Sequence, residues 1–420
     1  MLLLQKFMKE KINGLISSLG VRFGFDSHYF IKNTIWLLMG QALMSVAAFL
    51  ATVVLANKMS KHDLGDFRLI VSIYTTLVFF TMSGLTGAFM RSIVNGFEGA
   101  LEEAIAIKKR YGLLTFFIGC CVALYFFYKG NATFALLVLV ASAAIPYIES
   151  YSMYSPYLQA KHEFRLSSLN QGLIKLISSI AVIVVAYFMP QTLYLVIAFY
   201  GSQAVVNFIQ YKVLTKKFPP KNNNRDEAML PYAKHLTLSG FAALIFGQAD
   251  KFILYHFFGP AALASYWIAS TVPQEVGRVV STVVQVGYPK FVKVDHVNAK
   301  EYLPKRFLQS IGVLVLISLL YACIAYPFFH FFFPLYVGEV SKSIVLMFAF
   351  AIIPHYFVWG YFAAKGRHKI IYLSNTLDPV LQVLLYLVCI PLFGIWGLVY
   401  AMLIKTVLMN IVAWYVLKTQ

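Results

Sequence analysis

Charged residues are scarce in this chain of 420 residues: Asp, Glu, Lys and Arg together make up 12% of it, whereas 60% is hydrophobic. So few charges cannot cover the surface of a soluble protein of this length. Aromatic residues, at 16%, are numerous enough to form interfacial belts and to line a cavity. The composition therefore predicts an integral membrane protein.

Catalytic and metal-binding motifs are also missing. The four cysteines lie in apolar stretches without a C-x-x-C spacing or a neighbouring histidine cluster, which argues against a disulfide framework or a metal site. The sequence contains no G-x-x-x-x-G-K-[ST] phosphate loop, no H-E-x-x-H and no G-x-S-x-G. We therefore expect no enzyme, no cofactor and no ATP-driven transport by this chain alone.

Long apolar stretches are what the sequence does contain. A bilayer core of ~30 Å is crossed by about 20 helical residues, and twelve stretches reach that length. They cover residues 33–56, 68–90, 111–128, 132–157, 167–189, 192–214, 235–258, 261–288, 307–333, 343–364, 370–392 and 395–417. We therefore predict an all-α membrane protein with twelve transmembrane helices embedded in a lipid bilayer.

The 35 Lys and Arg residues are distributed unevenly over the connections between these stretches. If the N-terminus is cytoplasmic, the outer loops, of which the longest is expected at 57–67, hold only five cations: Lys58, Lys61, Arg68, Lys129 and Lys342. The positive-inside rule therefore places both termini in the cytoplasm. The formal net charge of +18 is spread over inner loops rather than gathered on one soluble face, which argues against binding of nucleic acid.

One polar stretch divides the chain. Residues 216–235 include two adjacent prolines and three consecutive asparagines, typical of a linker. We predict an amphipathic cytoplasmic segment at 1–30, a six-helix lobe at 31–214, a cytoplasmic linker at 215–234 and a second six-helix lobe at 235–420. Because each lobe begins and ends in the cytoplasm, the two lobes would be related by an axis along the membrane normal.

Charged residues inside the apolar stretches are candidates for a functional site, because a charge at the bilayer centre costs about 2.5–3.5 kcal/mol. Four acids and four bases lie there: Glu149, Asp250, Glu275, Asp378, Lys175, Lys251, Arg278 and Lys405. This balance leaves open whether a substrate would be an anion or a cation. Lys175 and Glu149 lie near inner helix ends, where a pair at the inner face or snorkelling explains them equally well.

The other six charges lie in the second lobe. Asp250 and Lys251 are neighbours and are expected to reach into the bundle. Glu275 and Arg278 are three residues apart, so they can pair on one helix face. Lys405 lies near the midplane, and we predict that it lines a cavity in preference to serving only as a structural partner of Asp378.

Two stretches carry a likeness to a known family. Residues 32–91 begin with Asn33-Thr34-Ile35-Trp36, pass through an outer turn with Leu64, Gly65 and Phe67, and end with Gly84-Leu85 leading to Arg91. Residues 247–270 read GQADKFILYHFFGPAALASYWIAS. Both resemble the polysaccharide-transport (Wzx-type) flippases of the multidrug/oligosaccharidyl-lipid/polysaccharide (MOP) superfamily.

The resemblance implies a MATE-like fold in the bacterial inner membrane. It also implies movement of undecaprenyl-diphosphate-linked oligosaccharide repeat units from the cytoplasmic to the outer leaflet. Such units serve the assembly of O-antigen (lipopolysaccharide) or capsule together with other polysaccharide assembly proteins. We expect alternating access, with the polyprenyl tail left in lipid.

In this hypothesis Arg278, Lys251 and Lys405 form a cationic cavity that offsets desolvation of the diphosphate. Arg91 and Lys290 occupy corresponding positions in the two lobes, and would either capture the diphosphate at the inner mouth or serve as ordinary positive-inside anchors. The acids Asp250, Glu275, Asp378 and Glu149 would serve in ion coupling or in charge pairing.

Two other functions remain open. An ion-coupled multidrug or cation exporter of the same fold would use Asp250, Glu275 or Asp378, but its cavity should hold more acids than bases. A membrane polysaccharide polymerase would need a sizeable outer loop or a polar catalytic cluster, and the sequence shows neither.

Overall fold

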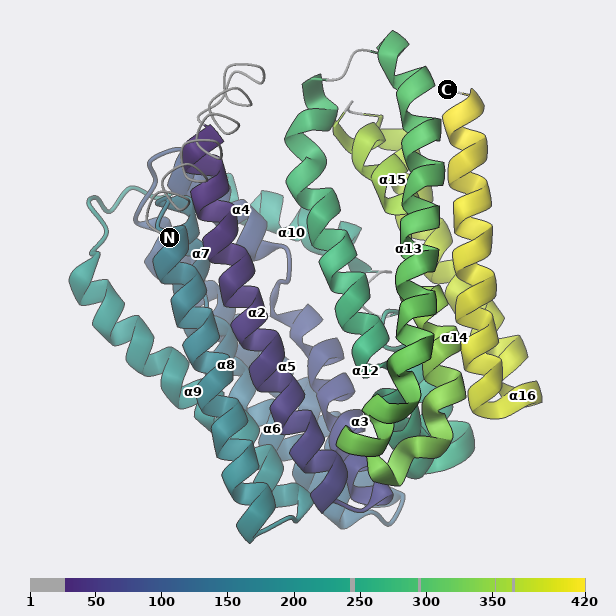
Figure 1. Ribbon diagram of the computed structural model, residues 1–420. Coiled ribbons are helices and arrows are strands. Elements are labelled where there is room, and N and C mark those ends of the chain that lie inside the picture. The colour runs from purple at the N-terminus through teal and green to yellow at the C-terminus, as the bar shows by residue number, and fades with distance from the viewer. Residues whose placement is uncertain (1–26, 242–245, 294–295, 352, 365–366, 420) are drawn as a thin grey trace, which may run out of the picture.

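The computed structural model describes residues 27–241, 246–293, 296–351, 353–364 and 367–419. Within these ranges the chain is helical and contains no strand (Figure 1). The amphipathic segment expected at 1–30 lies almost entirely outside them. We call the side of the bundle with Ser27 and the C-terminus the terminus side, and the opposite side, with Gly130 and Gly394, the turn side.

The helices follow one another through the chain with short connections. The first lobe, here the N-lobe (27–217), consists of α2 (Ser27–Lys58), α3 (Lys61–Val78), η1 (Phe79–Thr81), α4 (Leu85–Val94), α5 (Ala100–Tyr128), α6 (Ala132–Tyr151), α7 (Tyr154–Ala160), α8 (Phe164–Phe188) and α9 (Thr192–Lys217). After α10 (Met229–Ser239), the C-lobe (246–419) consists of α12 (Ala249–Lys293), α13 (His296–Phe332), η2 (Pro334–Glu339), α14 (Val340–Ala351), α15 (His355–Ala364) and α16 (His368–Thr419).

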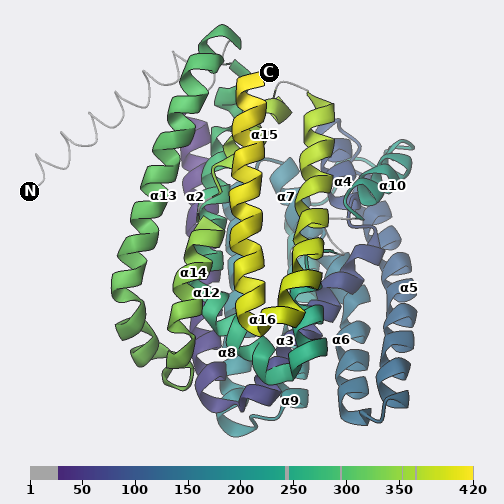
Figure 2. The same ribbon diagram turned by 90° about the vertical axis from the view of Figure 1, so that its right-hand side faces the viewer.

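Ten of the described helices are long and apolar enough to cross a membrane, and two of them are double. In α12 the backbone leaves the helical region at Gly259 (φ 78°, ψ −177°), and in α16 it does so at Gly394 (φ 61°, ψ −135°). Glycine is suited to both positions because a positive φ is unfavourable for residues with a Cβ. Figure 2 shows the limbs of α16 running side by side from this turn. The predicted all-α architecture with twelve segments in two lobes is confirmed.

The second predicted segment and the turn before it differ from expectation. Ser60 caps α3, because its Oγ accepts a hydrogen bond from the Asp63 amide at 3.0 Å, so the helix begins at Lys61. The outer loop expected at 57–67 is therefore wrong, and Arg68 lies two turns inside a helix. The segment also does not run straight to residue 90, since Met82 (φ 61°) separates α3 and η1 from α4.

The lobes pack tightly against each other on the turn side. A Cβ on Gly65 would lie 1.9 Å from the Pro260 carbonyl oxygen, so α3 and α12 meet there backbone to backbone. Asn57 Nδ2 donates to the Phe332 carbonyl at 2.9 Å, and one hydrophobic core contains residues of both lobes. On the terminus side the buried core residues form separate clusters, and the ribbons of α2 and α12 diverge towards that side (Figure 1).

Helix α10 begins within the predicted linker (215–234), ends inside the predicted segment 235–258, and packs on the N-lobe rather than on the C-lobe. Met229 and Ala233 are buried in one cluster with residues of α4, α5 and α7. The Gly84 amide donates to Thr237 Oγ1 at 3.0 Å, and a Cβ on Gly84 would lie 2.4 Å from the Thr237 nitrogen. The N-lobe therefore holds the chain up to the end of α10.

Candidate functional site: two adjoining cationic cavities

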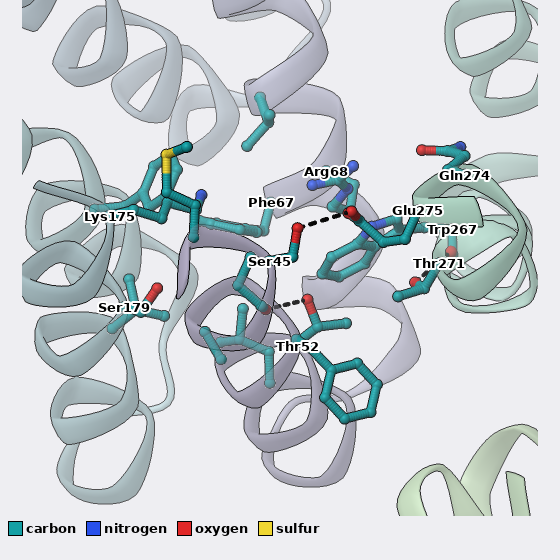
Figure 3. Close-up of a pocket in the computed structure, with 18 of the residues that line it drawn as sticks. Ser45, Thr52, Phe67, Arg68, Lys175, Ser179, Trp267, Thr271, Gln274 and Glu275 are labelled. Carbon is teal, nitrogen blue, oxygen red and sulfur yellow. Dashed lines mark hydrogen bonds between the residues drawn. The ribbon is translucent and has the colours of Figure 1, made fainter. Parts of the chain in front are cut away.

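A cavity of about 310 Å³, here the interlobe cavity, lies between the two lobes. Its walls come from α2, α3, α8 and α9 of the N-lobe and from the second limb of α12 of the C-lobe. Figure 3 shows polar and aromatic side chains from both lobes pointing into this space. Three of the lining residues are bases, Arg68, Lys175 and Arg278, and one is an acid, Glu275.

Arg68 is the base that the sequence analysis misplaced. Its guanidinium carbon lies 3.9 Å from the ring centroid of Trp267, so a cation of the N-lobe stacks on an aromatic ring of the C-lobe (Figure 3). The signal for its position was present in the sequence. The Ser60-x-x-Asp63 pattern marks a helix start at Lys61, which would have placed Arg68 inside the membrane.

Lys175 lies across the cavity from Arg68, on α8. It is half-buried, and its Nζ lies 5.3 Å from the ring centroid of Phe199. Among the described residues, neither Lys175 nor Arg68 has a carboxylate oxygen within 4.0 Å. Each cation instead contacts an aromatic ring, and Lys175 lines the cavity rather than lying at the inner surface.

Glu275 and Arg278 form the ion pair that their spacing predicts. Ser45 on α2 donates its Oγ hydrogen to Glu275 Oε2 at 3.0 Å, so this acid also bridges the two lobes (Figure 3). The side chain of Arg278 is 57% exposed, which leaves it accessible from the cavity. The Glu275–Arg278 pair is thus part of the cavity wall, and an anion that enters the cavity would contact Arg278.

A second cavity of about 410 Å³, here the C-lobe cavity, adjoins the first. Gln274 and Arg278 line both cavities. The other charged groups of the C-lobe cavity are two ion pairs. Lys251 Nζ lies 2.9 Å from Asp250 Oδ1, and Lys405 Nζ lies 3.1 Å from Asp378 Oδ1.

These ion pairs show how Lys405 and Asp250, two of the predicted site residues, are placed. Lys405 both lines a cavity and pairs with Asp378, so the two roles do not exclude each other. Asp250 is only 3% exposed and also accepts a hydrogen bond from the Tyr266 hydroxyl at 2.8 Å. Together the two cavities are lined by five basic and three acidic side chains, which gives them a net positive charge.

Three residues predicted for the site lie elsewhere or are not described. Arg91 stacks on Tyr232 of α10, 5.0 Å from the ring centroid, and lines neither cavity. Glu149 pairs with Lys108 at 3.0 Å inside the N-lobe, where Lys108 also donates to Thr81. Lys290 lies on α12, but its side chain is outside the described part. Within the described ranges no group of three His, Cys, Asp or Glu side chains is placed to hold a metal ion.

This chain is similar in sequence to one protein family. The sequence profile of a family described as polysaccharide biosynthesis protein matches residues 30–295, more than half of the chain. No curated protein matches the sequence significantly.

Solved structures share the fold at low sequence identity. An outward-facing multidrug resistance MATE family transporter of the MOP superfamily superposes with a TM-score of 0.63 at 13% identity, over 93% of this chain and 94% of that one. An inward-facing structure of such a transporter gives 0.62 at 12% identity, over 92% and 97%. A MOP superfamily transporter from Pyrococcus furiosus Vc1, reported with a binding pocket of reverse polarity, gives 0.61 at 14% identity, over 93% and 96%.

Proposed function

This chain belongs to the family of polysaccharide biosynthesis proteins and has the fold of MOP superfamily transporters, and from this premise we propose that it is a flippase for lipid-linked oligosaccharides. Its substrate would be an undecaprenyl-diphosphate-linked oligosaccharide repeat unit. The protein would lie in the bacterial inner membrane with both termini in the cytoplasm, and would move the unit to the outer leaflet.

The observation that carries this proposal is the pair of cations without a carboxylate partner in the interlobe cavity. Burying a cation in a membrane protein is costly unless a counter-charge offsets the loss of hydration. Neither Arg68 nor Lys175 forms an ion pair among the described residues, and Glu275 in the same cavity wall is paired with Arg278, so an anionic group of the substrate would complete the site. Arg68 suits a diphosphate because a guanidinium donates paired hydrogen bonds to phosphate oxygens.

The transport cycle follows from where the lobes touch. The contact of Gly65 with Pro260 and the bond from Asn57 to Phe332 close the turn side, which would face outward. In this state the sugar diphosphate would enter from the cytoplasm. Arg68, Lys175 and Arg278 would hold the diphosphate, while the sugars would fill the C-lobe cavity. Separation of the lobes on the turn side would then release the head group outside.

A second function has one observation in its favour. Asp250 is buried beside a cavity in a fold shared with multidrug transporters, and a buried carboxylate could bind a proton or a cation for coupled export. The two cavities, however, hold more bases than acids, which disfavours a cationic cargo. The polymerase alternative has no support beyond the family name.

Deletion of the gene in its host tests the proposal. A flippase defect would remove long surface polysaccharide and make lipid-linked repeat units accumulate on the cytoplasmic leaflet, and the intact gene would restore both. Normal surface polysaccharide together with new sensitivity to cationic dyes would move the assignment to the exporter.

A further inference from the structure

The C-lobe contains a third cavity, much larger and far more apolar than the two cationic ones. Its volume is about 1020 Å³, and helices α12, α13, α15 and α16 form its walls. Figure 1 shows α12, α13 and α16 alongside one another in this lobe. The lining includes Leu303, Phe307, Leu314 and Val358, all at most 7% exposed, and one charged residue, Arg306. We call this space the apolar groove.

The groove and the cationic cavities lie against neighbouring faces of the same helix segment. Arg278 lines both cationic cavities, and the next residues of α12, Val279 and Val280, line the groove. Since successive helical residues are rotated by about 100°, α12 separates a charged compartment from an apolar one at this level.

The groove runs along α13 from the terminus side towards the middle of the membrane. Its α13 wall runs from Leu303 to Ile317, and the apolar stretch of this helix begins near Phe307 on the terminus side. From Phe307 to Ile317, at 1.5 Å per residue, the wall extends about 15 Å into the apolar stretch, which reaches about the middle of a ~30 Å hydrocarbon core. Arg306 lies at the end nearer the terminus side and accompanies Gln309, to which its guanidinium donates at 3.2 Å. The groove thus begins beside a cation and continues as an apolar channel.

We propose that the apolar groove binds the isoprenoid chain of the lipid-linked substrate while the diphosphate occupies the adjoining cationic cavities. This inference rests on the proposed function. A lipid with an anionic head and a long apolar tail needs a charged compartment and an apolar one within reach of each other, and α12 provides both. The tail would then be held by the protein during loading, rather than remaining wholly in bulk lipid as the sequence analysis assumed.

Gly312 offers a way to block the groove without disturbing the fold. It lines the groove on α13, and a Cβ built there meets no heavy atom within 4 Å. Gly201 on α9 has the same open surroundings but lines neither cationic cavity nor the groove. Gly312→Phe therefore fills the groove, and Gly201→Phe is its matched control.

The experiment measures flipping in proteoliposomes of two substrates with the same oligosaccharide diphosphate head. One carries the undecaprenyl chain and the other the much shorter geranyl chain. We expect Gly312→Phe to lower transport of the undecaprenyl substrate about tenfold relative to Gly201→Phe, since losing the burial of roughly two methylene groups gives such a factor. Transport of the geranyl substrate should change much less.

Two other results would overturn either the groove proposal alone or the flippase assignment as well. Unchanged transport by Gly312→Phe, or an equal loss for both substrates, would overturn the groove proposal while leaving the flippase assignment intact. Failure of the unaltered protein to move either substrate would overturn the flippase assignment itself, and the groove proposal with it.

Photolabelling of the unaltered protein gives a test that needs no substitution. An undecaprenyl diphosphate probe with a photoreactive group in its chain should label peptides containing Val279 or Val313. Excess undecaprenyl diphosphate should suppress this labelling, whereas excess phosphatidylethanolamine should not. Equal suppression by both would show that the groove is an ordinary lipid contact and would overturn the proposal.

Discussion

Arg68 and Lys175, on the N-lobe wall of the interlobe cavity, have no carboxylate within ion-pair distance among the described residues. On the C-lobe side, Lys251, Arg278 and Lys405 each have one. Both lobes thus place cations beside a cavity, but only the C-lobe cations are neutralised within their own lobe. The net positive charge of the two cavities therefore comes from the N-lobe. In the proposed mechanism, the N-lobe cations would act mainly on the anionic substrate, whereas the C-lobe cations would also stabilise their own lobe.

The largest effect should follow from breaking a C-lobe pair. In Lys405→Ala, the Asp378 carboxylate loses its cation at a site where its side chain is only 25% exposed. We expect a loss of about 2–3 kcal/mol in the free energy of unfolding, somewhat below the value for a fully buried pair because the cavity leaves both groups partly accessible. Thermal unfolding of the purified protein in detergent measures this loss.

Lys175, on the N-lobe, provides the control for Lys405→Ala. Lys175→Ala removes a cation without a carboxylate partner and should leave the unfolding temperature unchanged or raise it. The double substitution Lys405→Met with Asp378→Leu should regain most of the lost stability, since it leaves no uncompensated charge. If the double variant is as unstable as Lys405→Ala, the ion pair is not the source of the loss.

Removal of Arg68 should act on transport rather than on stability. We expect Arg68→Ala to lower flipping of the lipid-linked oligosaccharide by about 10- to 100-fold, because a hydrogen bond to a charged group contributes about 1.5–3 kcal/mol. Arg68→Lys should be intermediate, since an ammonium keeps the charge but not the planar pair of donors. Transport in proteoliposomes at equal protein content is the measurement.

Arg91→Ala serves as the matched control, because Arg91 lies outside both cavities. The comparison between the lobes would fail if Arg68→Ala retained full transport while Arg278→Ala and Lys405→Ala both lost it in a stable protein. That result would assign the diphosphate to the C-lobe, as the sequence analysis predicted.

Trp267 should contribute less than the cation that it contacts. Its ring lies 3.9 Å from the Arg68 guanidinium carbon, and a cation–π contact contributes about 0.5–2 kcal/mol depending on desolvation. Trp267→Phe keeps a weaker ring and should lower transport only about two- to threefold, whereas Trp267→Ala should lower it further. An equal loss in both variants would show that the indole is needed for its shape and not for its π face.

The sequence predicted the helical architecture well because membrane spans depend on local apolar length, which a single chain reveals. It also predicted the pairing of Glu275 with Arg278, since that contact is local to one helix turn. It misplaced Arg68 because the segment boundary was drawn at the first continuous apolar run, seven residues after the capped helix start at Lys61. The partners of Glu149, Arg68 and Lys175 come from other helices, and such contacts depend on packing that one sequence does not specify.

The linker gives a further contrast between sequence and structure. Its prolines and asparagines are typical of a solvated connection, yet it is fixed to the N-lobe by Glu98, which is only 7% exposed. The Lys221 amide donates to Glu98 Oε2 at 2.7 Å, and Lys161 forms an ion pair with Oε1. The chain between the lobes is therefore anchored to the N-lobe near Lys221 as well as through α10.

The last effect that we expect is on this anchor, and it concerns the linker rather than transport. Burial alone would raise the pKa of Glu98, but the hydrogen bonds from Lys161 and the Lys221 amide outweigh it and lower that pKa below its ordinary value. A lowered folded-state pKa stabilises the anchor above the ordinary pKa of a glutamate, and this contribution is lost as the pH falls through the folded-state value. Glu98→Gln should loosen the linker at pH 7 by about 1 kcal/mol, or roughly fivefold in the amide exchange of residues 219–228.

Hydrogen exchange read by mass spectrometry, with exposed Glu102→Gln as the control, tests this expectation. At a pH below the folded-state pKa of Glu98, the unaltered protein and Glu98→Gln should exchange equally fast, because the side chain at position 98 is then uncharged in both. A difference that persists there would mean that Glu98 holds the linker through its packing rather than through its charge. Convergence would show that the charge of Glu98 holds the part of the linker near Lys221 on the N-lobe, whereas α10 is held there by its packing.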